Sequence, residues 1–190
     1  MLHAITPGLY LHVGSIGTRS CLAGFDLGGT IIRTNKSNFK GNTWEWEFMP
    51  NSLSVLKYYR DNGYTLVIFS NQNYEGDDLF YAMIRNDVII STLISLDINP
   101  WFLISTQQDI YRKPNTGMWD IFTHYYTEAM TLLNDNNLCQ HMNPLGLINR
   151  QLSFFTGDSA GRSEDRTSND KDFAQNVGVR FYTPEQIFLR

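Results

Sequence analysis

The sequence predicts an α/β protein in which helices cover both faces of a doubly wound, mostly parallel sheet. Short apolar runs of strand length recur along the 190 residues, and segments with helical periodicity separate them. Strands that alternate with helices form right-handed βαβ units, and these build a parallel sheet. The length and the 42% hydrophobic content suit one domain over residues 1–190 with a substantial core.

Each predicted element rests on a local pattern. A leading edge strand is expected at residues 8–13, and buried strands at 22–26, 64–69, 101–105, 152–156 and 179–182. Residues 31–49 are polar with interleaved aromatics, which predicts a loop or a short hairpin over the strand ends. Residues 134–150 are rich in asparagine and predict a surface loop.

The predicted helices follow from periodicity and from their end signals. Pro50 is expected to open the first helix, and Gly63 stands where a C-terminal cap belongs. Thr183 and Pro184, with Gln186 three residues after the threonine, predict the start of the last helix. The remaining helices are expected at 77–96, 117–133 and 170–176.

Charge and composition limit the kinds of function that the protein can have. The formal net charge is −4 without a block of like charge, so nucleic-acid binding would require a local positive patch. The two cysteines, Cys21 and Cys139, form no metal-binding pattern and suit a reducing compartment. Neither a signal peptide nor a membrane span is recognisable, so we expect a soluble protein with an intracellular, nuclear or cytoplasmic location.

Residues 22–30 are the most informative stretch. A short apolar run leads directly into a glycine turn, and Asp26 stands at the carboxyl end of the predicted strand. In parallel α/β sheets, ligands bind at this edge. An aspartate there can hold a cation or attack phosphorus, and Gly28 and Gly29 let the backbone approach a ligand closely. The alternative is an ordinary aspartate-containing turn.

Polar groups recur at comparable places after later strands. Asp26, Ser70, Lys113 and Asp158 each follow a predicted strand, and Asp170 is a fifth candidate. Together they fit a phosphoryl-transfer site, with one attacking carboxylate, a hydroxyl and an ammonium on the phosphoryl oxygens, and further carboxylates for Mg²⁺.

Each of these residues also has an ordinary structural interpretation. Ser70 could cap a helix or turn, Lys113 could belong to a solvated face, Asp158 to a loop and Asp170 to a helix start. Their joint occurrence in this order favours the site.

The same residues carry a resemblance to a known family. The order Asp26-x-x-Gly-Thr30, Ser70, Lys113 and Gly157-Asp158 resembles the four motifs of haloacid-dehalogenase-like phosphotransferases. More narrowly, residues 22–188 resemble the 3′-phosphatase domain of polynucleotide kinase 3′-phosphatases. The most specific strings are Arg112-Lys113-Pro114 with Gly117-Met118-Trp119, and Gly157-Asp158 with Ala160-Gly161-Arg162.

The resemblance implies a role for each residue. Asp26 would be the nucleophile that forms an aspartyl-phosphate. The phosphoryl group would be bound by Ser70, Asn71, Lys113 and Thr30, and Mg²⁺ by Asp26, the carbonyl of Gly28, Asp158 and Asp170. Candidates for substrate contacts are Arg162, Arg112 and Trp44. The sequence has no GxxxxGK[ST] motif and therefore no P-loop kinase half.

One departure from the family bears on catalysis. The expected Asp-x-Asp-Gly-Thr reads Asp26-Leu27-Gly28-Gly29-Thr30, so the second aspartate, which protonates the leaving oxygen and then activates water, is missing. A slow enzyme, a non-catalytic relative that binds phosphate ends, and a substitute acid are the alternatives. Glu45 and Glu47 could substitute, or could be solvent-facing loop acids. Superfamily branches with dehalogenase or phosphonate-cleaving chemistry also vary this position.

A second departure bears on the substrate. Relatives usually carry a partly basic loop after the Ser70 motif, whereas residues 73–78 are acidic here. The intervals between the motifs leave no room for a cap domain, so the site is expected to be open and to suit a large substrate. Trp44 and Trp46 could stack on a terminal base or pack in the core.

The leading prediction is Mg²⁺-dependent removal of 3′-phosphate from nucleic-acid ends, in particular DNA ends in repair. The alternatives are a receptor without turnover, motivated by Gly28, and a phosphatase for another phosphomonoester, motivated by residues 73–78.

Overall fold

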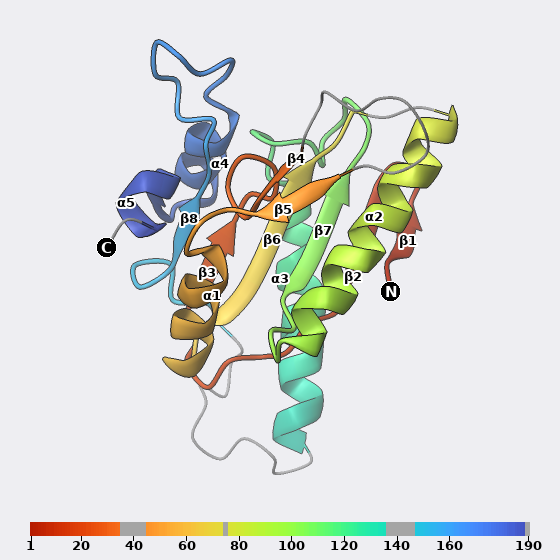
Figure 1. Cartoon of the computed structure of the whole chain (residues 1–190). Helices are drawn as coiled ribbons and strands as arrows, with labels where there is room; N and C mark the ends of the chain where they lie inside the picture. Colours follow the sequence, from red (N-terminus) through yellow and green to blue (C-terminus); the bar gives the residue numbers. More distant parts are fainter. Residues whose placement is uncertain (35–44, 74–75, 136–146, 189–190) are drawn as a thin grey trace.

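A seven-stranded sheet with the strand order β1-β2-β7-β6-β3-β8-β9 forms the centre of the protein (Figure 1). The structure is a computed structural model and describes residues 1–34, 45–73, 76–135 and 147–188. The strands of this sheet are β1 (His3–Thr6), β2 (Leu9–His12), β3 (Leu22–Phe25), β6 (Thr65–Asn71), β7 (Trp101–Ser105), β8 (Phe154–Thr156) and β9 (Arg180–Tyr182).

Five of the strands are parallel, as predicted. They run in the order β7, β6, β3, β8 and β9, and each pair has a parallel register. The prediction of an edge strand at residues 8–13 is wrong in one respect. β2 forms there, but β1 pairs with it and is the strand at the edge of the sheet. Pro7 and Gly8 join these two strands, and the φ of +83° at Gly8 is typical of a type II turn.

Helices cover both faces of the sheet, which confirms the doubly wound α/β architecture (Figure 1). Side chains of α1 (Ser52–Asp61), α2 (Gly76–Ser95) and α5 (Pro184–Phe188) pack on one face, around Phe25 and Phe102. Side chains of α3 (Gly117–Asp135) and α4 (Asn169–Val177) pack on the other face, around Phe69 and Phe155. Neighbouring strand residues alternate between the two cores because side chains of a strand alternate in direction.

The helix ends follow the sequence signals closely, with one correction. Gly63 follows α1 with a φ of +79°, and the Gln186 side chain accepts a hydrogen bond from Thr183 N at 2.9 Å, as in a capping box. The first helix does not begin at Pro50, however. Asn51 has a left-handed φ of 63° that interrupts the helical backbone, and its side chain donates to Phe188 O at 2.9 Å.

The hairpin expected within residues 31–49 is formed by β4 (Ile32–Thr34) and β5 (Trp46–Phe48), which pair antiparallel. Trp46 and Phe48 pack against the core, and their rings meet edge to face at 5.1 Å, so the core-packing interpretation holds for Trp46. Trp44 lies outside the described residues, as do Cys139, Tyr74 and Glu75 and most of the predicted 134–150 loop.

Between β3 and β6 and between β6 and β7, the described residues form this hairpin, α1 and α2, and no cap domain is found among them. Of the helices that the structure describes, none is both long and apolar enough to cross a membrane.

Candidate active site

A cavity of about 400 Å³ lies at the carboxyl ends of the parallel strands. The end of β6 and the turns that follow β3, β7 and β8 line it, because the carboxyl ends of parallel strands meet at one edge of a sheet. The structure thus brings together most of the predicted site residues: Asp26, Gly28, Ser70, Asn71, Arg112, Lys113, Asp158 and Asp170.

Lys113 lies at the floor of this cavity, and its side chain is only 1% exposed. Its Nζ donates to Asp26 Oδ1, to Asp170 Oδ1 and to Phe69 O, each at 2.7 Å, so all three ammonium protons can be engaged. The side chain of Asn71 holds the backbone of the same residue, because its Nδ2 donates to Lys113 O at 2.8 Å and its Oδ1 accepts from Lys113 N at 2.9 Å. Lys113 is therefore fixed at both ends.

Within the cluster formed by Asp26, Asp158, Asp170 and Lys113, the carboxylates outnumber the single ammonium. Burial raises the pKa of Asp26 to about 7, and the charge of Asp170 adds to this effect, although Lys113 opposes it. Burial would lower the pKa of Lys113, but Asp170 and Asp26 outweigh burial and raise it. Burial and the charge of Asp170 also raise the pKa of Asp158. This cluster therefore favours the arrival of a further cation.

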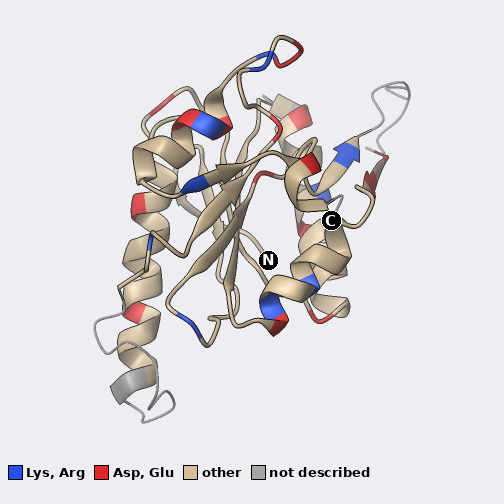
Figure 2. Cartoon of the chain, turned by 90° about the vertical axis from the view of Figure 1, so that its left-hand side faces the viewer, with Lys and Arg blue, Asp and Glu red and all other residues tan. Residues whose placement is uncertain are grey.

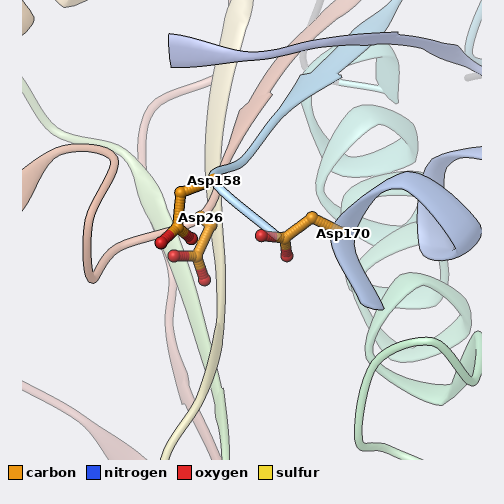
Figure 3. A group of neighbouring side chains, drawn as sticks. All are labelled: Asp26, Asp158 and Asp170. Atoms are coloured by element: carbon orange, nitrogen blue, oxygen red, sulfur yellow. The ribbon is translucent and has the colours of Figure 1, made fainter. Parts of the chain in front are cut away.

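Asp26, Asp158 and Asp170 point toward one another from three separate segments (Figure 3). One oxygen from each carboxylate lies within 4.8 Å of the others. Oxygen ligands of this kind suit a hard divalent cation such as Mg²⁺. The residues present therefore fit the ion that the family resemblance implies.

Two glycines make room for the carboxylates. A Cβ atom at Gly29 would lie 2.4 Å from Asp158 Oδ2, and Gly29 also has a φ of +80°, which other residues rarely adopt. A Cβ atom at Gly157 would lie 2.4 Å from Asp170 Cγ. The close approach of these acids to the backbone therefore depends on glycine at both positions.

Gly28 differs from these two glycines. A Cβ atom built there meets no atom within 4 Å, and its φ is not in the left-handed region. Gly28 also lines the cavity. A side chain could therefore begin at this position without a clash at its Cβ atom, so the departure at Gly28 removes a functional group where the backbone leaves room for one.

Comparisons with known proteins agree with this geometry. The family model described as "Polynucleotide kinase 3 phosphatase" matches residues 21–188. The chain belongs to this family. All the residues that line the cavity lie within residues 21–188, the part of the chain that matches the family.

Three relatives show how widely the similarity extends. An "Uncharacterized 20.8 kDa protein" of Autographa californica nuclear polyhedrosis virus is 31% identical and covers 95% of this chain and 93% of the relative. The "Polynucleotide 3'-phosphatase" of Saccharomyces cerevisiae is 34% identical, covering 86% of this chain and 85% of the relative. The "Bifunctional polynucleotide phosphatase/kinase" of Schizosaccharomyces pombe is 34% identical, but this chain spans only 42% of it.

Solved structures share the fold. A HAD-like phosphatase from Mesorhizobium loti has a TM-score of 0.60 at 18% identity, and the alignment covers 93% of this chain and 78% of that structure. A D,D-heptose 1,7-bisphosphate phosphatase from B. bronchiseptica, complexed with magnesium and phosphate, has a TM-score of 0.54 at 16% identity, with 86% and 79% covered. The chain therefore has the haloacid-dehalogenase-like fold of its family.

Three of the predicted contacts lie away from the cavity or outside the described residues. Thr30 is fully buried and is not among the residues that line the cavity. Arg162 binds Asp165, donates to Asp158 O at 3.1 Å and pairs with Glu185 at 3.2 Å, so it holds the loop after β8 together. The roles predicted for Thr30, Arg162 and Trp44 remain predictions of this family resemblance.

Neither of the proposed stand-in acids lines the cavity in the described part of the chain. Glu47 pairs with Arg33 across the β4–β5 hairpin, and both side chains are more than half exposed. Glu45 precedes β5 and is exposed. The structure thus gives no support to a substitute for the missing family acid at either position.

Several residues of the cavity were not predicted from the sequence. Arg85 of α2 and Arg166 of the loop after β8 line it, together with Gln72, which follows the predicted Ser70 and Asn71. Arg85 and the adjacent Asn86 are both buried, although they interrupt an apolar helix. That interruption was the available signal, since polar residues on a buried helix face require partners.

Proposed function

We propose that this chain is a Mg²⁺-dependent phosphomonoesterase that removes 3′-phosphate from nucleic-acid ends, in particular DNA ends in repair. The observation that carries the proposal is the cluster of Asp26, Asp158 and Asp170 around the buried Lys113. Family membership supports a phosphatase, and the names of the relatives supply the polynucleotide 3′-end. A nuclear or cytoplasmic location belongs to the same proposal.

Asp26 is the proposed nucleophile. Lys113 holds one of its carboxylate oxygens at 2.7 Å, which leaves the second oxygen for attack on phosphorus. The bond between phosphorus and the sugar 3′-oxygen breaks, the sugar oxygen takes up a proton from solvent water, and the phosphoryl group stays on Asp26. Water then attacks this aspartyl-phosphate, which releases inorganic phosphate and restores the carboxylate.

The remaining residues hold the phosphoryl group. Ser70, at the end of β6, lines the cavity and supplies a hydroxyl for a phosphoryl oxygen, and the positive charge of Lys113 offsets the charge of the phosphoryl group. Mg²⁺, when bound by Asp26, Asp158, Asp170 and the carbonyl of Gly28, supplies positive charge that offsets the charge of the phosphoryl group.

Arginines of the cavity wall support a nucleic-acid substrate. Positive and negative charges are interspersed over the molecule (Figure 2), and the net charge is −4. Arg85, Arg112 and Arg166 nevertheless line the same cavity as the catalytic carboxylates. They form the local positive patch that binding of a phosphate backbone requires on a protein of this charge.

Gly28 sets the expected rate. Both half-reactions need a proton transfer that an aspartate at this position would perform, and loss of a general acid–base group typically costs about 10²–10⁴-fold. Because the space at Gly28 is open, we expect Gly28→Asp to raise kcat by about 10²-fold or more. Gly28→Asn has nearly the same shape without the acid and is the matched control.

The test measures phosphate release from a 3′-phosphorylated oligonucleotide with Mg²⁺. A 5′-phosphorylated oligonucleotide and an aryl phosphate serve as competing substrates, and Asp26→Asn serves as the inactive control. We expect preference for the 3′-phosphate and no turnover in Asp26→Asn. Equal turnover of the aryl phosphate would favour a different phosphomonoester, and activity without Asp26 would contradict the assigned nucleophile.

A second candidate function is a receptor for phosphate ends without turnover, which the absence of an acid at Gly28 favours. This candidate predicts that the chain and its Gly28→Asp variant both bind the 3′-phosphorylated oligonucleotide and that neither releases phosphate. Release by Gly28→Asp alone would show that the site is complete apart from the acid.

A further inference from the structure

We infer that Gln72 and Arg85 are positioning residues that direct the hydroxyl proton of Ser70 into the cavity, toward the phosphoryl group. The inference rests on the proposed function, because it concerns how the same site binds a phosphoryl oxygen. It adds two residues, one of them on a helix outside the quoted motifs, to the machinery of the site.

The Gln72 side chain connects the end of β6 to α2. Its Nε2 donates to Ser70 Oγ at 3.4 Å and to Asn86 Oδ1 at 3.2 Å. Its Oε1 accepts from Asn86 Nδ2 at 3.1 Å and from Arg85 at 3.3 Å. All four residues are buried, with exposed fractions of 0–7%, so solvent competes little for these hydrogen bonds.

Arg85 decides which way the amide of Gln72 points. The pair formed with Asn86 is reciprocal, so it would be equally good if both amides were turned over. A guanidinium, however, only donates hydrogen bonds. The atom of Gln72 that faces Arg85 must therefore be the oxygen, and the atom that faces Ser70 must be the nitrogen.

The direction of the Ser70 proton follows from this order. A hydroxyl has one proton to donate, and an oxygen that already accepts from Gln72 Nε2 must use that proton elsewhere. Among the described residues, the hydrogen-bond partner of Ser70 Oγ is Gln72 Nε2. Since Ser70 lines the cavity, its proton is available to a phosphoryl oxygen placed there.

The main test reverses the direction of the hydrogen bond between Gln72 and Ser70 with one isosteric substitution. Gln72→Glu presents an acceptor to Ser70, which then donates to the new carboxylate and no longer to substrate. We expect Ser70→Ala and Gln72→Glu each to lower kcat/KM about 10- to 100-fold, the usual effect of one hydrogen bond to a charged group. In the Ser70→Ala background, Gln72→Glu should have little further effect, because no hydroxyl remains to be directed.

If the loss of kcat/KM in the double variant equals the product of the losses in the two single variants, the inference is overturned. Such a result would mean that the change at Gln72 acts through the fold or through its added charge, independently of the hydroxyl.

Arg85 is tested with a matched pair of variants. Arg85→Lys keeps a side chain that only donates and should retain most of the activity, whereas Arg85→Met frees the Gln72 amide to turn over and should lose activity about 10-fold or more. Arg180→Met, at the amino end of β9, removes the same charge far from the cavity and should leave turnover unchanged. Equal loss in Arg85→Lys and Arg85→Met would contradict the donor argument.

A binding readout separates this inference from the proposed function. Calorimetry with inorganic phosphate and Mg²⁺ measures the same hydrogen bond without turnover of any oligonucleotide. We expect Ser70→Ala, Gln72→Glu and the double variant to weaken phosphate binding to the same extent, even if the 3′-phosphate substrate proves wrong. Unchanged phosphate affinity in Gln72→Glu would overturn the role of Gln72 whatever the substrate is.

Discussion

At the scale of single residues, Lys113 holds the site together. Its ammonium lies between two carboxylates and a backbone carbonyl, each at 2.7 Å, in a nearly solvent-free position. A buried charge of this kind stabilises a protein only while its partners remain, because the desolvation of each charge is offset by the others.

We predict that Lys113→Met lowers the free energy of unfolding by about 3–5 kcal/mol at pH 8, since it leaves Asp26 and Asp170 buried side by side. Without the ammonium, the pKa of Asp26 rises further above its present value of about 7. The folded state then binds more protons than the unfolded state between about pH 4 and this pKa, so the stability of the variant falls as pH rises through that window.

Urea denaturation at pH 5 and pH 8 measures this effect. Lys57→Met, on α1, is the control and should change stability by no more than about 0.5 kcal/mol at either pH. A Lys113→Met variant that is as stable at pH 8 as at pH 5 would contradict the proposed charge balance.

The raised pKa of Asp26 also predicts how Mg²⁺ affinity depends on pH. Cation binding needs the ionised carboxylate, and in the metal-free protein Asp26 is largely protonated below its pKa of about 7. Affinity should therefore fall as pH falls through 7, approaching about tenfold per pH unit if one proton is displaced. Calorimetric titration from pH 5.5 to 8.5 checks this, and Asp26→Asn should flatten the dependence.

At the scale of secondary-structure elements, the turns after β3 and β8 determine the geometry of the acids. We predict that Gly157→Ala weakens Mg²⁺ binding at least tenfold and costs about 1–3 kcal/mol of stability, because its Cβ would collide with Asp170. Gly28→Ala, whose Cβ meets no atom, should leave stability unchanged or slightly raised. Similar stability losses in both variants would mean that the turns are less tightly packed than described.

Elements with a clear local pattern could be predicted from the sequence. The strand at 101–105 was placed correctly, because its run is apolar on both faces, and α1 was found from its periodicity and from Gly63. β1 could not be predicted in the same way. Two of its four residues are exposed, and it is a strand only because the Pro7-Gly8 turn pairs it with β2.

The residues of the candidate site that lie near strand ends could also be predicted from the sequence. Asp26 and Asp158 follow strands within two residues and Ser70 lies at the end of one, where side chains with suitable chemistry meet the edge of the sheet, and the structure places all three at one cavity. Arg85 could not be predicted, because it reaches the cavity from the middle of a helix and through a contact with Gln72. Such a contact depends on how α2 packs on the sheet, and local sequence does not encode that packing.

At the scale of the whole molecule, two cores on opposite faces of one continuous sheet predict a single cooperative unit. We expect one unfolding transition, with coincident changes in far-UV and near-UV circular dichroism and an enthalpy near 60 °C of about 130 kcal/mol. Mg²⁺ should shift this transition upward by mass action, and much less in Asp158→Asn. Two separated transitions would contradict a single domain.

The unobstructed backbone at Gly28 also has a genetic consequence. The glycine codons GGT and GGC become aspartate codons through one base change, and the surrounding structure leaves room for the Cβ atom of the new side chain. A population that depended on this protein for survival could therefore gain an acid at this position in one mutational step. Selection from a randomly mutated library, under demand for phosphate release, should recover that change repeatedly and without accompanying mutations.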